Sequence, residues 1–305
     1  MRSSDIPIDE LLKRLHLANA RRLWPELVQR AEKEQWGFER FLGVLVSEEV
    51  AQRKGTRLRR VTAQARFPFL KTIDDFDFTH QSMVRLSLLG SALSADFVTE
   101  GRSLILSGKT GRGKTHLAIA ISYRAIQNGF DALFTTAAAL IDDLSRASRE
   151  GRMREALTAY THPDVLVCDE VGYLTYGSDA ANVLFHVVNE RHLKRRSMIF
   201  TTNKALSTWG HVLHDSDLAA AIIDRILERG RLLTLDGPSM RTRHLNLDGA
   251  AATEMGSETS RATAPDGAEQ RGSGGASPGE AETLARFSGM DRADFPEPTA
   301  PSYVC

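Results

Sequence analysis

Residues 103–115 read Ser-Leu-Ile-Leu-Ser-Gly-Lys-Thr-Gly-Arg-Gly-Lys-Thr, and this stretch decides the fold. Its apolar run, residues 104–106, has the length and branching of a buried strand. The run leads into Gly108-x-x-x-x-Gly113-Lys114-Thr115, the complete phosphate-binding loop pattern, and a helix is predicted directly afterwards, over residues 115–128. A strand, a glycine-rich loop and a helix in this order predict a site for the phosphates of a nucleotide.

Each residue type in the loop has a physical purpose. The glycines can adopt positive φ and leave backbone N–H groups open to phosphate oxygens. Lys114 brings a positive charge to the β- and γ-phosphates, Thr115 offers a hydroxyl to Mg²⁺, and the positive end of the helix favours anions. The predicted nucleotide-binding residues are therefore Gly108, Lys109, Thr110, Gly111, Arg112, Gly113, Lys114, Thr115 and His116.

Apolar runs of strand length alternate with helical stretches beyond the loop. Further strands are predicted at residues 132–135, 165–170, 198–203 and 231–235. Helices are predicted before, between and after them, at residues 81–93, 140–149, 153–160, 180–194 and 218–229. Such alternation implies right-handed crossovers, and therefore an α/β fold whose parallel sheet is covered by helices on both faces.

Polar side chains are expected to meet at the carboxyl ends of these parallel strands. Asp169 ends a buried strand, where an acid can orient Mg²⁺ together with Thr115. Glu170 points to the other side of the strand end and can polarise a water for attack on the γ-phosphate, which favours hydrolysis over transfer to a second substrate. Asn203, at the end of the next strand, can hold that water or cap a turn. With Lys114, these residues form the predicted catalytic set.

Arg225 follows Asp224 in a helix that is apolar enough to be half-buried. An arginine in such a helix needs a counter-ion or a phosphate. It can serve as an arginine finger for the nucleotide of a neighbouring subunit, or it can pair within its own chain with Asp224 or Glu228. The spacing leaves both interpretations open, and we count Arg225 among the candidate catalytic residues.

Residues 1–66 are predicted to be helical, with Pro25 starting a helix rather than interrupting one. Residues 1–70 carry 14 Lys or Arg against 9 Asp or Glu. This basic balance suits a phosphate backbone, although a solvated helix face accommodates such charges equally well. The candidate DNA contacts are Arg53, Lys54, Arg57, Arg59 and Arg60.

Composition divides the chain into four parts. The helical domain, residues 1–66, is followed by a linker at 67–80 whose Phe side chains are expected to pack on the next domain. The ATPase domain occupies 81–247. Residues 248–305 are rich in small and polar residues, with 10 acids against 4 arginines, and are predicted to form a disordered tail. This acidic tail cancels the basic charge of the rest, so that the formal net charge is zero.

Several classes of protein are disfavoured by composition. The two cysteines, Cys168 and Cys305, are too far apart in sequence to suggest a disulfide framework or a zinc site. No apolar run approaches 18 residues and the N-terminus has no signal pattern, so a soluble, cytoplasmic protein without membrane partners is expected. The histidines show no metal-ligand spacing, which leaves Mg²⁺ as the expected metal.

These motifs together resemble a known family. Phe67-Pro68 in the linker, Gly113-Lys114-Thr115-His116, Asp169-Glu170-Val171-Gly172-Tyr173-Leu174, Thr201-Thr202-Asn203 and Ala221-Ile222-Ile223-Asp224-Arg225 stand as they do in IstB-like transposition helper ATPases. That family is related to DnaC-type helicase loaders within the AAA+ class of P-loop NTPases. The resemblance covers about residues 8–247.

The resemblance implies ATP and Mg²⁺ as cofactors and a homo-oligomer with ATP at its subunit interfaces. It also implies assembly on duplex DNA and recruitment or activation of a partner transposase. Asn203 corresponds to the sensor position, Arg225 to the arginine finger, and Arg241 lies near the place of a further family arginine. Two alternatives stay open: a replicative helicase loader that binds single-stranded DNA, and a nucleotide-gated scaffold with negligible turnover.

Overall fold

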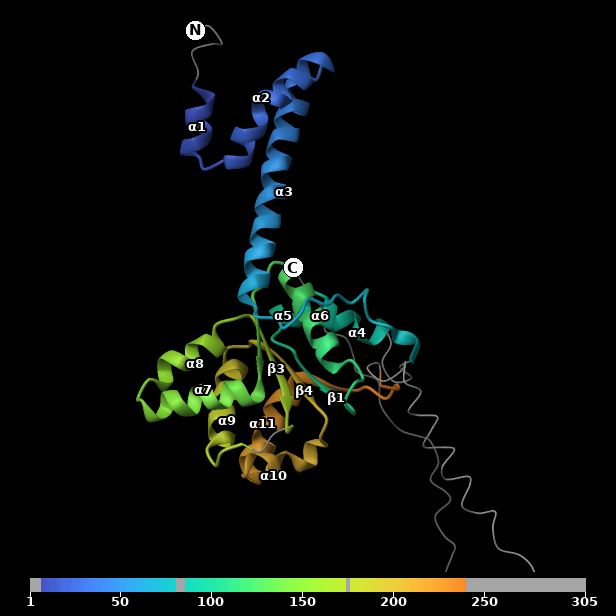
Figure 1. Ribbon diagram of the computed structural model, residues 1–305, viewed down its shortest axis with the longest axis vertical. Coiled ribbons are helices and arrows are strands. Elements are labelled where there is room, and N and C mark those ends of the chain that lie inside the picture. Colours follow the sequence, from blue (N-terminus) through green and yellow to red (C-terminus); the bar gives the residue numbers. More distant parts are fainter. Residues whose placement is uncertain (1–6, 81–85, 174–175, 240–305) are drawn as a thin grey trace, which may run out of the picture. The chain divides into compact units, whose positions relative to one another are not determined.

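The structure is a computed structural model that describes residues 7–80, 86–173 and 176–239 (Figure 1). Arg241 and the predicted tail at 248–305 lie outside the described residues, as do residues 81–85 of the helix expected at 81–93. Of the described helices, none is both long and apolar enough to cross a membrane.

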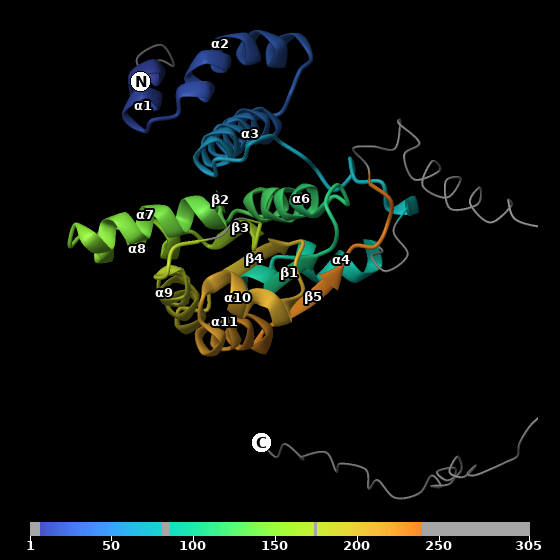
Figure 2. The same cartoon turned by 60° about the horizontal axis from the view of Figure 1, so that its bottom comes forward.

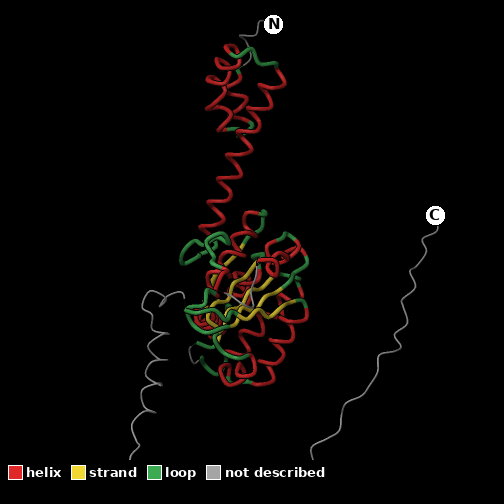
Figure 3. Tube along the Cα trace, turned by 90° about the vertical axis from the view of Figure 1, so that its right-hand side faces the viewer, coloured by secondary structure: helices red, strands yellow, loops and turns green. Residues whose placement is uncertain are grey.

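Three helices make up most of residues 7–66, which were predicted to be helical (Figure 3). They are α1 (Ile8–Arg14), α2 (Ala18–Lys33) and α3 (Phe38–Gln64). Pro25 lies inside α2, so the expectation that it starts a helix is wrong. Pro25 and Arg21 are both exposed, so water can bond the Arg21 carbonyl that the proline nitrogen leaves without a donor.

Five strands form one parallel sheet with the order β2-β3-β4-β1-β5. They are β1 (Ser103–Ser107), β2 (Ala132–Thr136), β3 (Val165–Val171), β4 (Ser197–Thr202) and β5 (Gly230–Thr234). Each predicted strand is present to within about one residue at either end. The expected fold class is thereby confirmed to this extent: an α/β fold with one parallel sheet, preceded by helices.

Side chains along the strands alternate between two hydrophobic cores, one on each face of the sheet. Leu104 and Leu106 face the core that contains α6 (Lys114–Gln127), whereas Ile105 faces the other. Figure 2 shows α6 on one side of the sheet and α9, α10 and α11 on the other. The second core is built with α7 (Ala137–Arg149), α8 (Met153–Thr161), α9 (Ala180–Leu193) and α11 (Ser216–Glu228).

Several short elements were not predicted because they are too short for a periodic pattern. They are η2 (Phe78–His80), α5 (Asp96–Thr99), η3 (Leu206–Thr208) and α10 (Trp209–Leu213). Of the predicted helix at 81–93, the structure describes α4 (Leu86–Leu93). Trp209 is fully buried in the second core, so α10 is part of the packed domain.

The C-terminal end of α3 and the linker after it pack on the α6 side of the sheet. Val61 and Ala65 are buried in the α6 core, and the Phe134 N–H in β2 donates a 2.8 Å hydrogen bond to the Ala65 carbonyl. Phe67, Phe76 and Phe78 also pack there, as expected of the linker, while Phe69 remains half exposed.

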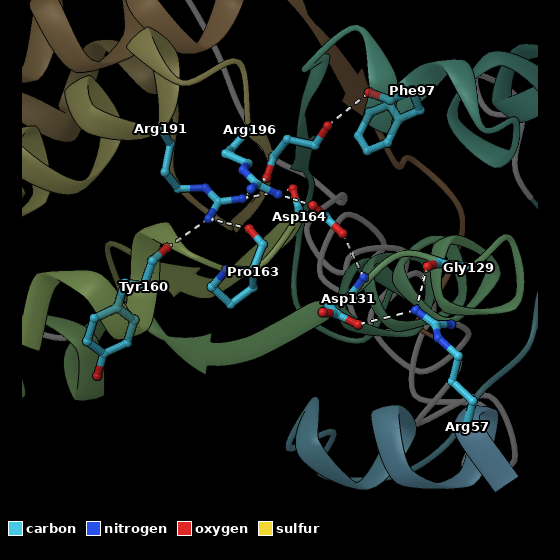
Figure 4. A network of polar contacts seen from close by, with 10 residues as sticks. Arg57, Phe97, Gly129, Asp131, Tyr160, Pro163, Asp164, Arg191 and Arg196 are labelled. Carbon is cyan, nitrogen blue, oxygen red and sulfur yellow. Dashed lines mark hydrogen bonds and ion pairs between the residues drawn. The ribbon is translucent and has the colours of Figure 1, made fainter. Parts of the chain in front are cut away.

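A polar network joins α3 to the amino ends of the strands (Figure 4). Arg57 of α3 donates a 2.5 Å hydrogen bond to the Gly129 carbonyl and lies 3.5 Å from the Asp131 carboxylate. The Asp131 N–H donates to the carboxylate of Asp164, which also pairs with Arg196. The fully buried Arg191 donates to four backbone carbonyls, those of Tyr160, Pro163, Asp164 and Ser197. This network lies at the edge of the sheet opposite to the strand ends that carry the predicted catalytic residues.

Candidate nucleotide-binding site

The loop between β1 and α6 has the conformation that a phosphate cradle requires. Gly111 and Gly113 have φ of 82° and 87°, a left-handed region that disfavours other residues. A Cβ on Gly113 would lie 2.6 Å from the ring of Phe76, so the linker also demands a glycine there. Backbone conformation and close packing therefore both fix the glycines of the motif.

A pocket of about 440 Å³ opens beside this loop. The loop and α6 contribute Thr110, Gly111, Gly113, Lys114, Thr115 and His116; the strand ends contribute Glu170, Thr201, Thr202 and Asn203; Phe69, Lys71 and Tyr173 complete the lining. The pocket thus unites most of the predicted nucleotide-binding residues with three of the predicted catalytic ones, Lys114, Glu170 and Asn203.

Two basic side chains of the loop also make hydrogen bonds within the chain. Arg112 donates a 3.1 Å hydrogen bond to the Leu235 carbonyl, which follows β5. Lys114 Nζ donates to the Lys109 carbonyl at 2.9 Å, which folds its ammonium group back over the loop. Gly108, Lys109 and Arg112 do not line the pocket.

Thr115 and Asp169 lie together as predicted. Thr115 Oγ1 is 3.0 and 3.1 Å from the two carboxylate oxygens of Asp169, which is buried at the end of β3. A hydroxyl and a carboxylate are oxygen ligands of the kind that Mg²⁺ prefers. Among the described residues, no group of three or more His, Cys, Asp and Glu could hold a metal, so Mg²⁺ here would also depend on phosphate oxygens.

Thr201, which we did not predict as a site residue, binds both acids of the Asp-Glu pair. Its Oγ1 donates a 2.5 Å hydrogen bond to Asp169 Oδ1 and accepts a 2.9 Å bond from the Glu170 N–H. It comes from β4, the strand next to β3. A sequence signal exists, because Thr201 stands two residues before Asn203 at a strand end expected beside Asp169.

Glu170 occupies an irregular point of its strand. Its φ is 62°, and the register between β3 and β4 shifts between Cys168 and Val171. This bulge leaves the Glu170 side chain exposed at the pocket, while Asp169 stays buried. A β-bulge beside an active site re-aims a side chain, and here it separates the directions of two consecutive acids.

Tyr176, which no sequence pattern indicated as a site residue, holds this bulge. Its hydroxyl accepts a 3.0 Å hydrogen bond from the Gly172 N–H and donates one of 3.3 Å to the Glu170 carbonyl. Burial raises the pKa of Tyr176 to about 12, so the hydroxyl keeps its proton at neutral pH. Tyr176 therefore bridges the two ends of the strained turn after Glu170.

His116 connects α6 to the linker. Its Nε2 lies 3.0 Å from the Thr72 carbonyl, and its ring packs edge-on against Phe76 with 5.2 Å between centroids. Burial lowers the pKa of His116, outweighing the opposing effect of the Thr72 hydrogen bond. The linker therefore forms one wall of the pocket, and His116 connects it to α6.

Arg225 does not line the pocket of its own chain. Its Nε donates a 3.0 Å hydrogen bond to Asn189 Oδ1 of α9, and its guanidinium lies 4.7 Å from the ring centroid of Phe185. The alternative partners, Asp224 and Glu228, form no ion pair with Arg225 in the described part of the chain. Its contacts are with a neutral amide, an aromatic ring and the Ala221 carbonyl, to which it donates at 3.3 Å.

The basic residues of α3 separate into two groups. Arg53, Arg57 and Arg60 line one open pocket of about 710 Å³ with Arg22 and His16, whereas Lys54 and Arg59 do not. Arg53 also pairs with the buried Glu49 at 2.7 Å, and Arg59 donates to Thr56 Oγ1 at 3.3 Å. We refer to the side with Arg22, Arg53, Arg57 and Arg60 as the basic pocket.

Comparison with known proteins assigns the family. Residues 10–247 match the family model for IstB-like ATP-binding proteins. A relative from Geobacillus stearothermophilus, described as the putative ATP-binding protein of insertion sequence IS5376, is 34% identical to this chain. The match covers 79% of this chain and 95% of the relative. That of insertion sequence IS21 of Pseudomonas aeruginosa is 33% identical over 77% of this chain and 89% of its own length.

The crystal structure of DnaI aligns with 58% of this chain and 94% of its own, at 22% identity and a TM-score of 0.48. The family assignment comes from the sequence matches, which span both the helical segment and the sheet. The chain belongs to the IstB-like ATP-binding proteins of insertion sequences.

Proposed function

We propose that this chain binds and hydrolyses ATP with Mg²⁺, assembles on duplex DNA, and recruits or activates a partner transposase. The observation that carries the nucleotide part is the contact between Thr115 Oγ1 and the Asp169 carboxylate beside the phosphate loop. Insertion-sequence relatives named as ATP-binding proteins support the transposition context.

Five residues in or beside the pocket have a role in this proposal. Lys114 and the loop N–H groups bind the phosphates, while Thr115 and Asp169 are the residues that would hold Mg²⁺. The bound metal would neutralise charge on the β- and γ-phosphates. Glu170 accepts the proton of the attacking water, and Asn203 positions that water or the γ-phosphate.

A first experiment separates nucleotide binding from hydrolysis. Lys114→Ala should abolish ATP binding, whereas Glu170→Gln should retain binding and lose turnover, because the carboxamide keeps the shape of the side chain but cannot accept the proton. Equal turnover by Glu170→Gln and wild type would contradict the role of Glu170. Absence of hydrolysis in the wild type, with DNA present, would favour a nucleotide-gated scaffold.

Arg225 acts across subunits in this proposal, because it does not reach its own pocket. Its neutral partners, Asn189 and Phe185, leave the guanidinium charge uncompensated and available to a neighbour's γ-phosphate. Arg225→Ala and Lys114→Ala should each be inactive alone. Mixed, they should regain part of the activity, since an intact pocket then meets an intact Arg225. A mixture without any activity would assign Arg225 to packing alone.

The basic pocket is the proposed contact with the DNA backbone. A duplex has closely spaced phosphates, and arginines that release counterions make affinity strongly salt-dependent. The Arg22→Ala, Arg60→Ala double variant should weaken duplex binding and reduce the salt slope by about two. Arg59→Ala is the matched control from the same helix, and an equal loss with this control would mean that charge alone, without the pocket, determines binding.

A further experiment tests the assembly of the chain on DNA and the identity of its protein partner. Duplex binding and particle size are compared for wild type and Lys114→Ala, each with and without ATP. We expect the wild type to assemble on duplex DNA only with ATP, and Lys114→Ala not to assemble. We also expect the wild type to capture the transposase of the same element. Preference for single strands and capture of a replicative helicase would instead identify a helicase loader.

A further inference from the structure

One edge of the sheet is open. β5 is the last strand on its side, and among the described residues no strand lies beyond it (Figure 2). The Leu235 N–H donates a 2.8 Å hydrogen bond to the Ser107 carbonyl, toward β1. Because the backbone groups of successive residues in a strand point to opposite edges, Leu232 and Thr234 direct their N–H and C=O groups away from β1. Such an edge is a template for pairing with another chain.

The two faces of β5 differ in chemistry. Arg231 stands opposite Leu104 of β1, and Leu104 belongs to the α6 core. Arg231 therefore lies on the α6 face of the sheet, as does Leu233 two residues later. Leu232 lies on the other face and is 44% exposed. Arg231 is exposed and is the only charged residue of β5, so an added strand meets a cation on one face and an uncovered leucine on the other.

A pocket of about 300 Å³ opens between β5, β1 and the helices α4 and α5. Buried Ala92, Phe97 and Leu104 supply its apolar surface. Five charged side chains also line it: Glu100, Arg102, Glu228, Arg229 and Arg231. The pocket therefore offers both apolar contact and charge to a side chain that enters beside β5.

The two acids of this pocket already have partners. Glu100 contacts Arg102 at 2.5 Å, and Glu228 Oε2 lies 3.2 Å from His192 Nε2. Within the described part of the chain, no acid pairs with the other two arginines of the pocket. Arg229 donates to the His192 carbonyl, but its Nε is buried and has no acceptor among the described residues. The pocket thus carries positive charge that an incoming carboxylate would balance.

These features fit an extended peptide and not a nucleic acid. An open strand edge presents donors and acceptors, which another peptide backbone matches, whereas the phosphate oxygens of DNA only accept. Side chains of an added strand alternate between the faces of the sheet. Acidic residues would therefore meet Arg231 and the pocket, while apolar residues would cover Leu232. The chemistry selects an extended segment in which acidic and apolar residues alternate.

We propose that the free edge of β5 and this pocket bind an extended acidic segment of the partner transposase, which adds to the sheet as a further strand. The identity of the partner rests on the proposed function. The pocket beside β5 shares no lining residue with the nucleotide pocket or with the basic pocket. One chain can therefore hold nucleotide, DNA and transposase at the same time.

Proline at the edge tests strand addition. Leu232→Pro removes an N–H that points away from β1, so the pairing of β5 with β1 is kept while an added strand loses a donor. The Kd of labelled transposase for the full chain, measured with ATP and without DNA, should rise tenfold or more. Leu232→Val keeps the N–H and should bind as the wild type does. Unchanged ATP affinity and thermal unfolding show that both variants are folded.

Arg231→Glu tests the charge and does not depend on how the strand tolerates proline. It should also raise the Kd of transposase tenfold or more. Arg154→Glu, on exposed Arg154 of α8, makes the same change of charge elsewhere and should leave the Kd unaltered. Among overlapping peptides that cover the transposase sequence, those that bind the wild type and not Arg231→Glu should alternate acidic and apolar residues.

The outcomes separate the site from the function. Equal Kd values for the wild type, Leu232→Pro and Arg231→Glu would overturn the site and leave the proposed function intact, because the transposase would then bind elsewhere. A loss with Arg231→Glu but none with Leu232→Pro would also overturn it, since charge without strand addition would hold the partner. A wild type that binds no transposase would contradict recruitment in the proposed function, and this site with it.

Discussion

Thr201 Oγ1 donates a 2.5 Å hydrogen bond to Asp169 Oδ1, and the same oxygen accepts the Glu170 N–H at 2.9 Å. One hydroxyl from β4 therefore fixes both acids at the end of β3. Asp169 must present its carboxylate to Thr115, and Glu170 must keep its side chain in the pocket. Thr201 positions both acids through a neutral hydroxyl group.

Thr201→Val should lower kcat about tenfold or more and leave ATP affinity nearly unchanged. The change keeps the shape but deletes a hydrogen bond to a charged group and leaves the Glu170 N–H without its acceptor, which together cost roughly 1.5–3 kcal/mol. Steady-state hydrolysis and binding of a non-hydrolysable ATP analogue give the two values. Thr201→Ser, which keeps the hydroxyl, should retain most activity; equal losses in both variants would contradict the argument.

Gly113→Ala should abolish ATP binding and destabilise the domain. Alanine at φ of 87° is strained, and its Cβ would lie 2.6 Å from the Phe76 ring, so the linker must move off the loop. Gly151→Ala is the matched control, because Gly151 has φ of 70° but open space around it. Both variants share the backbone strain of alanine at positive φ, roughly 1 kcal/mol, but only Gly113→Ala also meets the Phe76 ring. ATP titration and thermal unfolding of both variants measure the difference.

Much of the fold could be predicted from the sequence because its elements carry local signals. Short apolar runs such as residues 104–106 and 165–168 have the length of buried strands. Because helices separate these strands in the sequence, a parallel sheet is predicted. The pairing of Thr115 with Asp169 was predicted for the same reason, since carboxyl ends of parallel strands share one edge.

What was missed depends on contacts between distant residues or on short segments. Tyr176 bonds backbone groups four and six residues before it across an irregular turn, and no pattern of residue types encodes that turn. Pro25 was misplaced because a proline at a helix start and one in an exposed helix interior look alike in sequence. The neutral partners of Arg225 likewise come from another helix, which spacing along α11 cannot reveal.

Arg191→Met should destabilise the protein by about 3 kcal/mol without changing the chemistry of the pocket. Arg191 is fully buried and donates to four carbonyls at the amino edge of the sheet (Figure 4). Methionine fills similar volume but deletes four hydrogen bonds. The Asp164 carbonyl still accepts the Ser197 N–H, and each buried acceptor that loses its donor costs roughly 1–3 kcal/mol before relaxation. Urea unfolding gives the value, with exposed Arg154→Met as the control that should change stability little. A loss below about 1 kcal/mol would show that water replaces the guanidinium.

His116 should make stability depend on pH just below neutrality. Burial lowers the pKa of His116 below its ordinary value of 6.5, so the unfolded chain binds a proton more readily than the folded one. The free energy of unfolding should therefore fall as the pH drops below 6.5 toward the folded pKa. Above pH 6.5 it should have its full value. Lys71 opposes protonation and Asp75 favours it, but burial is the largest cause.

His116→Gln separates this effect from that of the other histidines. Glutamine can still donate a hydrogen bond to the Thr72 carbonyl but does not titrate, so the link between α6 and the linker is kept while the proton is removed from the balance. Urea unfolding between pH 5.5 and pH 8, which spans roughly the ordinary histidine pKa, should give a shallower dependence for the variant than for the wild type. The difference between the two curves belongs to His116 alone, because the remaining histidines are common to both. Parallel curves would mean that His116 takes up its proton equally in the folded and unfolded chain, and that the wall formed by the linker does not shield it from water.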